Sequence, residues 1–446
     1  METAKKHSRL STEAMRTLAA GASGETTIIS LSDETIRFTA TGRKRMEQVL
    51  NETGGAMVYS DYTGHCLIDY QEGALRDDFD FGHCVMVNNS MLRKAVEGMV
   101  GDYEAAGWYD LRLRLSRLGR IIHIPEALYE VAPHAGCNKP ESGPGSEEQF
   151  AYVDPRNRES QIEMEKAVTD HLGSIGALVN ADSYPPIDFA SESFGTEVSV
   201  VIPVRNRRLT IADAVRSALA QQAGFRFNVI VVDNRSDDGT SGILAEIASR
   251  EPRLHVIDLK NMDGPAPGIG GCWNIAVNSE HCGRFAVQLD SDDVYSRPDT
   301  LELIVRKFYE ERCAMVVGSY MLTDFDGNPL PPGLIDHKEW TDQNGANNAL
   351  RINGLGAPRA FFTPIARKIS FPDVSYGEDY AMGLAVSRHF RISRIYEPLY
   401  SCRRWEGNSD HALSEERINR NNSYKDRVRT IELLARIEMN KTSGKA

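Results

Sequence analysis

The sequence predicts an α/β protein in which a mixed, mostly parallel sheet is covered by helices. The first observation is that continuous apolar runs alternate with helical stretches after residue 197. The second is that polar residues, namely Asn206, Asp233 and Asp290, directly follow three of these runs. Because ligands of parallel sheets gather at the carboxyl ends of the strands, this convergence predicts a binding site at that edge.

The first 195 residues divide into two expected parts. Residues 1–150 form one region, and residues 151–195 form a linker helix followed by a linker. Stretches 133–148 and 181–196 are rich in Gly, Pro and Ser, which is typical of linkers. Between them, Asp154-Pro155 predicts a helix start, since Asp caps a helix and Pro suits its first turn.

The third part, residues 196–405, carries the strand and helix alternation. We expect strands at 198–203, 227–232, 254–257 and 285–289, and helices at 210–222, from 236–240 onward and from about Pro298. Residues 406–446 are expected to form a C-terminal helical extension. The sheet and its site are therefore predicted in the second half of the chain.

Composition excludes several classes of protein. With 446 residues the chain is long enough for two or three domains, and its formal charge of −12 argues against a nucleic-acid partner. Seven cysteines without a C-x-x-C pair indicate reduced thiols and a cytoplasmic location. No apolar stretch reaches the ~18 residues of a membrane span. A homo-oligomer is compatible with all of this.

An acidic cluster, Asp290-Ser291-Asp292-Asp293, follows the strand expected at 285–289. Three carboxylates so close together repel one another, and a divalent cation would neutralise them. Mg²⁺ and Mn²⁺ prefer oxygen ligands and leave positions open for phosphate oxygens. The alternative is a solvated acidic turn before the next helix.

Five pieces of sequence, in order and at similar spacing, resemble the family 2 glycosyltransferases with the GT-A fold. They are VSVVIPVRNR (198–207), VIVVDNRSDDGT (229–240), GIGGCWNIAV (268–277), VQLDSDD (287–293) and GEDYAMGL (377–384). The resemblance implies a Mn²⁺ or Mg²⁺ that bridges the diphosphate of a nucleotide sugar. It makes Asp292 the first candidate ligand, with Asp290 and Asp293 contacting metal, ribose or sugar.

The same resemblance implies a general base. Asp379 takes this role, and Glu378 helps to place the acceptor, because the pair matches the family's E-D pair. A base near the acceptor hydroxyl is what the reaction needs. The alternative is helix capping, since carboxylates favour helix N-termini.

Further residues are implied to hold the nucleotide sugar. The strand-end residues Asp233 and Asn234 are candidates for the base or ribose, which favours a UDP-sugar without securing it. The glycines before Asn274 would let the backbone approach phosphate. The alternative is a tight loop leading into a helix. The implied nucleotide-sugar residues are Pro203, Arg205, Asn206, Asp233, Asn234, Gly270, Gly271, Asn274, Asp290 and Arg404.

The region after the strands completes the implied site. Arg404 and Trp405 resemble part of the Q-x-x-R-W element of processive synthases, but Ser401 replaces its Gln, so processivity is not expected. His411 is a candidate metal ligand or else a surface histidine. The loop at 335–362 is expected to recognise the acceptor, with Trp340 and Arg359 as candidates beside Trp405, although Trp340 could belong to the core.

Residues 26–62 align without gaps to residues 284–320, and 116–129 resemble 387–400. In this alignment Ser32, Glu34 and Thr35 stand where the acidic cluster has its carboxylates, and Trp108-Tyr109 stand where the E-D pair is. The first region would then be a truncated, degenerate GT-A-like repeat without metal or nucleotide binding. It would serve packing, oligomerisation or acceptor holding. Chance similarity of two α/β segments is the alternative.

These observations predict a metal-dependent, inverting transfer of a sugar from a nucleotide-diphosphate sugar to a hydroxyl of a carbohydrate or glycoconjugate. One alternative is a non-catalytic scaffold that binds sugar or nucleotide. Another is a sugar-phosphate nucleotidylyltransferase, which would need a Gly-rich basic loop after its first strand. The segment VIPVRNRRLT has the basic residues and no glycine.

Overall fold

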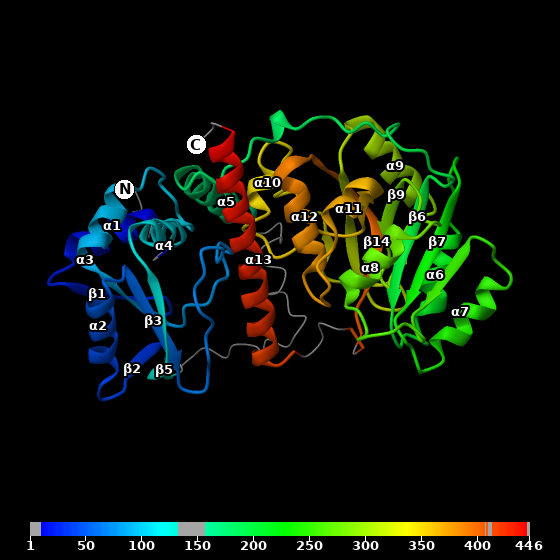
Figure 1. The fold of residues 1–446 in the computed structure, drawn as a ribbon. Coiled ribbons are helices and arrows are strands. Elements are labelled where there is room, and N and C mark those ends of the chain that lie inside the picture. The colour runs from blue at the N-terminus through cyan, green and yellow to red at the C-terminus, as the bar shows by residue number, and fades with distance from the viewer. Residues whose placement is uncertain (1–9, 133–156, 406, 409–412, 444–446) are drawn as a thin grey trace, which may run out of the picture.

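The computed structural model describes residues 10–132, 157–405, 407–408 and 413–443. These residues form two sheets that lie on either side of one long helix, α13 (Glu415–Thr442) (Figure 1). Residues 154 and 155, at the predicted start of the linker helix, lie outside the described residues, and helix α5 is described from Arg158 to Ser174.

The larger sheet is built around four parallel strands. These are β6 (Val198–Val204), β7 (Phe227–Asp233), β8 (Leu254–Asp258) and β9 (Phe285–Gln288). Their apolar, often β-branched residues suit strands that are covered on both faces. The predicted strands are therefore present, within a residue or two at their ends.

Beyond β9 the sheet becomes mixed. Its order is β10-β14-β11-β13-β9-β6-β7-β8, with β12 paired to β11. The added strands are β10 (Val294–Tyr295), β11 (Met315–Thr323), β12 (Pro329–Ile335), β13 (Arg359–Phe362) and β14 (Ile392–Arg403). Strand β13 runs antiparallel to β9 and β11, whereas β11 and β14 are parallel. The sheet is thus parallel around the strand ends expected to form the site and mixed elsewhere.

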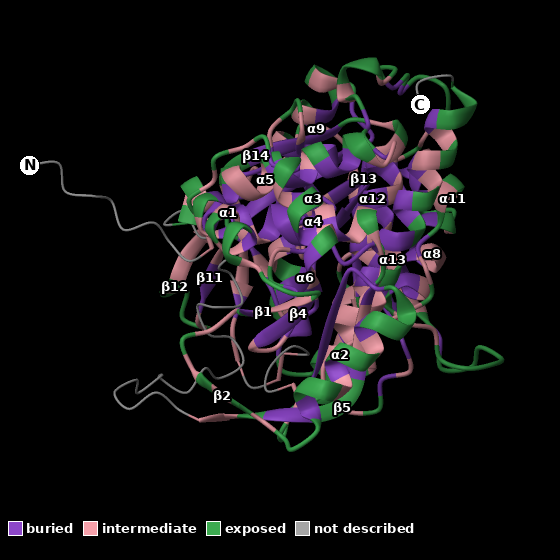
Figure 2. Cartoon of the chain, turned by 90° about the vertical axis from the view of Figure 1, so that its left-hand side faces the viewer, coloured by how far each residue is buried: buried purple, intermediate pink, exposed green. Residues whose placement is uncertain are grey.

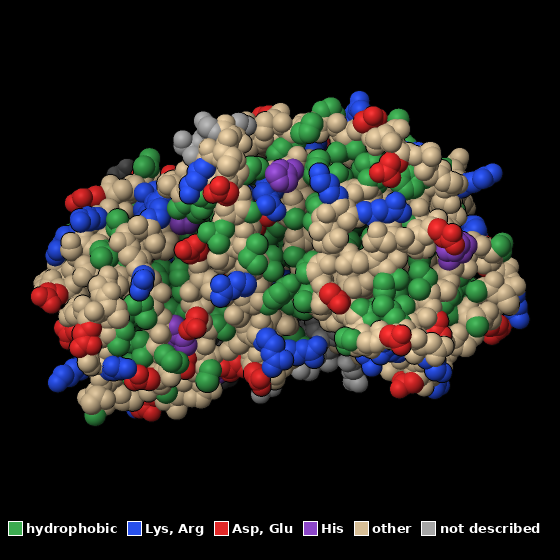
Figure 3. Space-filling model, viewed as in Figure 1, with side chains coloured by type: hydrophobic (Ala, Val, Ile, Leu, Met, Phe, Trp, Pro, Cys, Tyr) green, Lys and Arg blue, Asp and Glu red, His purple; other side chains and the backbone are tan. Residues whose placement is uncertain are grey.

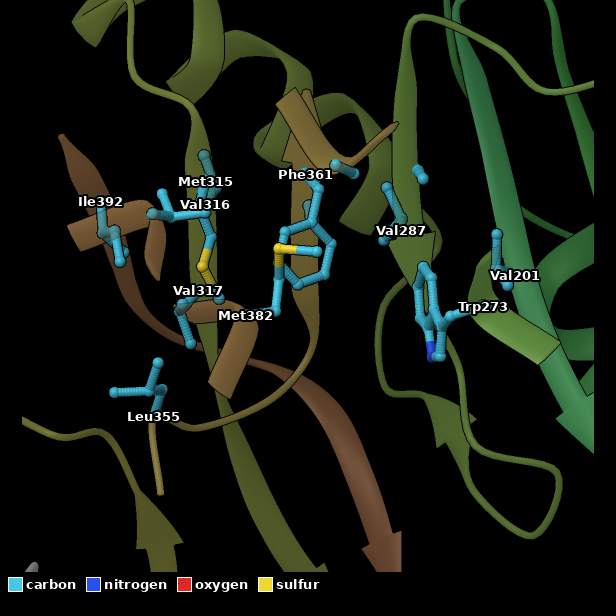
Figure 4. Packing of buried hydrophobic residues seen from close by; sticks show 14 of the residues in the cluster. Val201, Trp273, Val287, Met315, Val316, Val317, Leu355, Phe361, Met382 and Ile392 are labelled. Atoms are coloured by element: carbon cyan, nitrogen blue, oxygen red, sulfur yellow. The ribbon is translucent and has the colours of Figure 1, made fainter. Parts of the chain in front are cut away.

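Helices cover this sheet and pack on its apolar side chains. They are α6 (Ile211–Leu219), α7 (Thr240–Ala248), α8 (Ile269–Asn278), α9 (Thr300–Glu311), α10 (Gly345–Asn348), α11 (Thr363–Ile369) and α12 (Glu378–His389). Helix α6 ends before the predicted residue 222, because Gln222 N–H donates to the carbonyl of Pro298 and the Gln221 amide to that of Arg297. In Figure 4, Phe361 of β13 and Val287 of β9 lie between Met382 of α12 and Trp273 of α8.

The smaller sheet precedes the larger one in the chain. Its strands are β1 (Thr26–Ser30), β2 (Thr35–Phe38), β3 (Met57–Tyr62), β4 (Cys84–Asn88) and β5 (Ile121–Ala132). Its helices are α1 (Thr12–Gly21), α2 (Gly42–Thr53), α3 (Asn89–Glu97) and α4 (Gly107–Leu118). Buried residues line both sheets, whereas the outer faces of the helices are exposed (Figure 2).

The two sheets share one strand arrangement. The order β1-β4-β3-β5-β2 matches β9-β13-β11-β14-β10, and each pairing has the same direction as its counterpart. The register also agrees, since Met57 pairs with Ile121 as Met315 pairs with Ile392. The bounds of α4 and α12 set Gly107-Trp108 against Glu378-Asp379, one residue earlier than the sequence alignment predicts.

Helix α13 joins the two sheets through buried charges. Arg76 of the first half lies 3.4 Å from the Asp426 carboxylate, which also accepts from Arg429 at 2.9 Å. Arg429 in turn donates to the Tyr380 hydroxyl of α12 at 2.9 Å. The side chains of Asp426 and Arg429 are both 0% exposed, so the link between the halves is fully desolvated.

On the face seen in Figure 3, positively charged Lys and Arg side chains are interspersed with negatively charged Asp and Glu side chains. None of the described helices has the length and apolar character needed to cross a membrane. Six cysteines lie in the described part of the chain and are free. The cytoplasmic location stays a prediction.

Candidate functional site

The acidic cluster lies directly after β9, at the carboxyl end of the parallel strands. The Asp290 carboxylate accepts from the Gln288 amide at 2.8 Å, and its backbone N–H donates to the Tyr400 hydroxyl at 3.0 Å. Burial raises the pKa of Asp290, and the neighbouring charge of Asp292 adds to this. The charge of Arg359 opposes this shift, so Asp290 has both a like charge and an opposite charge near it.

Asp292 is a ligand candidate whose contacts to polar donors are long. Its Oδ2 accepts from the indole of Trp405 and the amide of Asn408, each at 3.3 Å, and lies 3.7 Å from Nε of Arg207. Its side chain is 14% exposed. These are long, weak contacts, so a cation can replace them at small cost.

Asp293 is used differently from its neighbours. Its Oδ1 accepts the Arg403 backbone N–H at 2.7 Å and so anchors the end of β14, and the residue is 4% exposed. Burial and the charges of Asp290 and Asp292 raise its pKa well above the ordinary value. Asp293 thus anchors the end of β14 in this structure, and its role as a metal ligand stays a prediction, as do the roles of Asp290 and Asp292.

The E-D pair begins α12, after Gly377 in a left-handed conformation (φ 76°). Asp379 Oδ2 forms an ion pair with Arg359 Nη1 at 2.7 Å. Burial raises the pKa of Asp379, but the charges of Arg359 and Lys425 outweigh it, so its pKa lies below the ordinary value. A carboxylate held in this way stays ionised at neutral pH.

Arg359 also joins the two acidic groups into one site. Burial lowers the pKa of its guanidinium, but the charges of Asp379, Asp290 and Glu378 more than compensate for this. Its backbone N–H donates to the Gln288 amide oxygen at 3.2 Å, and the Gln288 amide nitrogen donates to Asp290. The predicted acceptor residue is thus a neighbour of the predicted base.

Comparison with known proteins identifies the domain. Residues 199–368 match the family model described as glycosyl transferase family 2. These residues form a family 2 glycosyltransferase domain. The match includes the acidic cluster and Arg359, whereas α12, with the E-D pair, follows it.

Relatives of this domain are found among bacterial polysaccharide proteins. The chain is 36% identical over 133 residues to the putative teichuronic acid biosynthesis glycosyltransferase TuaG of Bacillus subtilis, covering 30% of this chain and 50% of that protein. It is 34% identical over 134 residues to the succinoglycan biosynthesis protein ExoO of Rhizobium meliloti, covering 30% and 36%. The chain thus spans half or less of these relatives.

A solved structure, S. aureus TarS 1-349 in complex with UDP-GlcNAc, aligns with a TM-score of 0.40 and 21% identity. The alignment covers 54% of this chain and 72% of that one.

In the family 2 domain the end of β7 carries two nucleotide candidates with different surroundings. Asp233 is 0% exposed, and its oxygens accept from the Ser236 N–H and the Ser241 hydroxyl. Both oxygens thus hold the turn that follows β7, and the predicted contact of Asp233 with the base or ribose stays a prediction. Asn234 donates to the carbonyl of Pro267, and its buried Oδ1 has no hydrogen-bond partner in the described structure.

The glycines before Asn274 serve packing. A Cβ on Gly270 would lie 1.9 Å from the carbonyl oxygen of Pro372, and one on Gly271 would lie 2.3 Å from Asp373. Asn274 donates to and accepts from the backbone of Phe371. Helix α8 thus packs closely against the segment that leads to α12, and phosphate binding by these residues stays a prediction.

The first-strand candidates lie at the same edge. Asn206 has a left-handed backbone (φ 54°), and its amide oxygen accepts the Asp237 N–H at 2.9 Å. Pro203 pairs with Val232 within the sheet, and Arg205 is exposed. Arg207, which is not among the predicted site residues, reaches the Asp292 carboxylate.

The predicted acceptor loop is mostly interior. Trp340 is 3% exposed, and the guanidinium of Arg394 lies 5.4 Å from its ring centroid. Such a ring has no free face for a sugar, so Trp340 belongs to the core. Arg351 of the same loop is 0% exposed and pairs with Asp77 of the first half. Only Arg359 of this loop reaches the catalytic groups named above.

Near the end of β14 the site includes Arg403, which is not among the predicted site residues. Arg403 donates to the carbonyl of Asp292 at 2.6 Å and to Asp213 at 3.2 Å. Its buried Nη2 has no partner in the described structure. Arg404 donates its backbone N–H to Thr323 instead. The alternation of side chains along β14 could have indicated that only one of Arg403 and Arg404 faces the site, because neighbouring residues of a strand face opposite sides of the sheet.

The described residues fit a loosely held divalent cation. In the described part of the chain no three His, Cys, Asp or Glu side chains form a complete metal-binding group. A cation at Asp292 would need phosphate oxygens and water to complete its shell, which suits Mg²⁺ and Mn²⁺. His411 lies outside the described residues.

The pH dependence of stability checks the environment of Glu378. Burial, and then the charge of Asp379, raise the pKa of Glu378 to about 8. The pKa of Glu378 is thus higher in the folded protein than its value of about 4.3 in the unfolded chain. The contribution of Glu378 to stability is therefore complete below pH ~4.3 and is lost as the pH rises through about 8. We expect the free energy of unfolding to fall by up to ~1.4 kcal/mol per pH unit in this window.

Glu378→Gln removes this titration. The free energy of unfolding of the variant should therefore fall less between pH 5 and 8.5 than that of the wild type. Urea unfolding of both proteins at several pH values measures the difference. Parallel profiles for wild type and variant would show that the carboxyl is not held neutral.

Proposed function

We propose that this protein is a metal-dependent, inverting glycosyltransferase that uses a nucleotide-diphosphate sugar, with UDP-sugars favoured. The acceptor is a hydroxyl of a carbohydrate or glycoconjugate. The observation that carries the proposal is that, within a chain holding a family 2 domain, Arg359 links the acidic cluster to Asp379. Two relatives, a putative teichuronic acid biosynthesis glycosyltransferase and a succinoglycan biosynthesis protein, support a carbohydrate acceptor.

In this mechanism Asp379 accepts the proton of the acceptor hydroxyl. The acceptor oxygen forms a bond to the anomeric carbon of the donor while the bond from that carbon to the diphosphate oxygen breaks. The electron pair of that bond leaves with the diphosphate. Attack from the opposite face inverts the configuration. Asp379 is accessible for this role, since its side chain is 26% exposed.

Asp292 and Asp290 would hold the cation. A bound Mn²⁺ or Mg²⁺ supplies Lewis-acid stabilisation of the charge that develops on the diphosphate. Arg207 and Arg403, on either side of Asp292, add positive charge for the same anion. Arg403 has a free Nη2 for this purpose, and Arg207 is only weakly paired.

The nucleotide base lies at the end of β7. The unpartnered amide oxygen of Asn234 is an acceptor for the ring N–H of uracil. Guanine also carries a ring N–H, so the base is best tested with UDP-, GDP- and dTDP-sugars in a thermal-shift panel. A ligand that binds the native state raises its apparent melting temperature.

The first half of the chain has no catalytic part in this proposal. At the position that corresponds to the acidic cluster, the Ser32 hydroxyl and the Glu34 carboxylate both contact His83, at 2.8 and 2.9 Å. These side chains satisfy one another and leave no acidic group free for a cation. The first half instead packs on α13, and self-association of the chain stays a prediction.

Metal dependence is tested by donor hydrolysis with and without Mn²⁺. We expect EDTA to remove hydrolysis and Mn²⁺ or Mg²⁺ to restore it. Asp292→Asn should lower kcat by about 10²-fold or more, because an amide is a poor ligand for a hard cation. Glu416→Gln, at a side chain that is 84% exposed on α13, is the matched control.

Full turnover of Asp292→Asn, or hydrolysis that is insensitive to EDTA, would contradict metal dependence. Donor binding without any turnover in the wild type would favour a sugar-binding scaffold.

A further inference from the structure

Two cations lie beside the proposed base. Arg359 Nη1 forms an ion pair with Asp379 Oδ2 at 2.7 Å and donates to the carbonyl of Gly356 at 2.9 Å. Its Nε and Nη2 donate to no residue in the described ranges. The side chain of Arg359 is 17% exposed and that of Asp379 is 26% exposed, so both reach solvent.

The second cation is Lys425 of α13. Its Nζ donates to the carbonyl of Asn353 at 2.6 Å and lies 4.6 Å from the ring centroid of Tyr376, which is 37% exposed. No carboxylate of the described residues forms an ion pair with it. Its charge nevertheless acts on Asp379, whose pKa burial raises and both cations lower.

Lys425 has no carboxylate partner among the described residues near the base. Glu378 is largely neutral at pH 7, since burial and the charge of Asp379 raise its pKa to about 8. Arg359 forms its ion pair with Asp379 and is also influenced by the charge of Asp290, so Lys425 is the cation that lacks a charged partner here. A partly buried cation without a counter-ion is costly, and a bound anion would remove that cost.

We propose that the acceptor carries a carboxylate or phosphate close to its reacting hydroxyl, and that Arg359 and Lys425 bind this anion. The inference rests on the proposed function and names the class of its acceptor. The planar fork of Arg359 suits either anion, and Lys425 adds a point charge. Because a base in an ion pair is a weak proton acceptor, drawing Arg359 toward the acceptor anion strengthens Asp379.

The anion thus has two effects. It contributes binding energy, and it frees the base only when the correct acceptor is present. A neutral acceptor leaves the guanidinium on Asp379, and the hydroxyl then meets a weaker base. The transferred proton still goes to Asp379, and the anion takes no part in bond making.

The test uses the full chain, the donor that is hydrolysed fastest in the panel, and three acceptor probes. Methyl β-D-glucoside is neutral, methyl β-D-glucuronide carries a carboxylate, and methyl β-D-glucoside 6-phosphate carries a phosphate. We expect kcat/KM to be at least about tenfold higher for one or both anionic probes than for the neutral one, as charged hydrogen bonds allow. The better anionic probe identifies the anion.

Arg359→Gln should reduce this ratio to near one, and Arg359→Lys should restore part of it. Lys425→Gln should reduce the ratio by a smaller factor. Arg367→Gln is the matched control, because the Arg367 guanidinium of α11 donates to the carbonyl of Val277, away from the base. Using a ratio of two acceptors cancels a general loss of folded or active protein.

Donor hydrolysis distinguishes a failure of the anionic-acceptor proposal from a failure of the proposed function. Wild-type hydrolysis with no preference for, or no transfer to, the anionic probes would overturn the anionic-acceptor proposal alone. Loss of preference in Arg367→Gln equal to that in Arg359→Gln would also overturn it. Absence of hydrolysis with every donor would refute the proposed function itself, and the inference with it.

Discussion

Asp379→Asn should lower the turnover of sugar transfer by about 10²- to 10⁴-fold, the range that general-base catalysis contributes. The amide keeps the shape of the side chain but cannot accept the acceptor proton. We expect the KM for the donor to change little, because the proposed donor contacts lie at the acidic cluster and do not include Asp379. Initial rates over a range of donor and acceptor concentrations separate the two effects.

The variant also removes the partner of Arg359, whose guanidinium pairs with Asp379 at 2.7 Å. Urea unfolding of Asp379→Asn is therefore needed beside the rates, to show that the chain remains folded. Glu416→Gln serves again as the control for removal of a carboxylate from the surface. Turnover of Asp379→Asn within threefold of wild type would exclude Asp379 as the base.

Arg429→Ala should destabilise the protein by about 3–5 kcal/mol, the cost of breaking a buried ion pair. Arg429 is 0% exposed and donates to Asp426, Tyr380, Asn353 and the carbonyl of Ile352. Its removal leaves these groups buried without their donor. Arg427→Ala, at an exposed arginine on the same helix, should change the free energy of unfolding by less than about 1 kcal/mol.

Activity should fall in Arg429→Ala even where the protein is still folded, because Tyr380 follows Asp379 in α12. Urea unfolding gives the stability, and kcat measured well below the melting temperature gives the activity. Equal stability of the Arg429 and Arg427 variants would mean that the buried network does not join the halves as described.

Much of the fold follows from local pattern. The apolar strand residues around Val200 and Ile230 are 0% exposed, as their continuous hydrophobicity predicts. The E-D pair does begin a helix, at Glu378. The acidic cluster does follow a buried strand, with Asp290 directly after Leu289. These features depend on residues close together in the chain.

Side-chain roles at the same edge were less predictable. The glycine spacing before Asn274 suits phosphate binding or tight packing equally, and only the tertiary structure shows how closely Pro372 approaches Gly270. Asp233 and Asn234 are neighbours, yet one is satisfied by the following turn and the other keeps an unpartnered oxygen. Burial of Trp340 depends on Arg394 of another strand, which no local pattern predicts.

The sequence by itself determined the strand-and-helix order, the acidic cluster at a strand end and the E-D pair at a helix start, because periodicity, capping and turn chemistry are local. Only the tertiary structure decided that Arg359 pairs with Asp379 and that Arg403 lies beside Asp292. It also decided that α13 brings Lys425 and Arg429 to helix α12. These contacts join residues distant in the chain, and they form because buried charges must find partners wherever the fold brings them together.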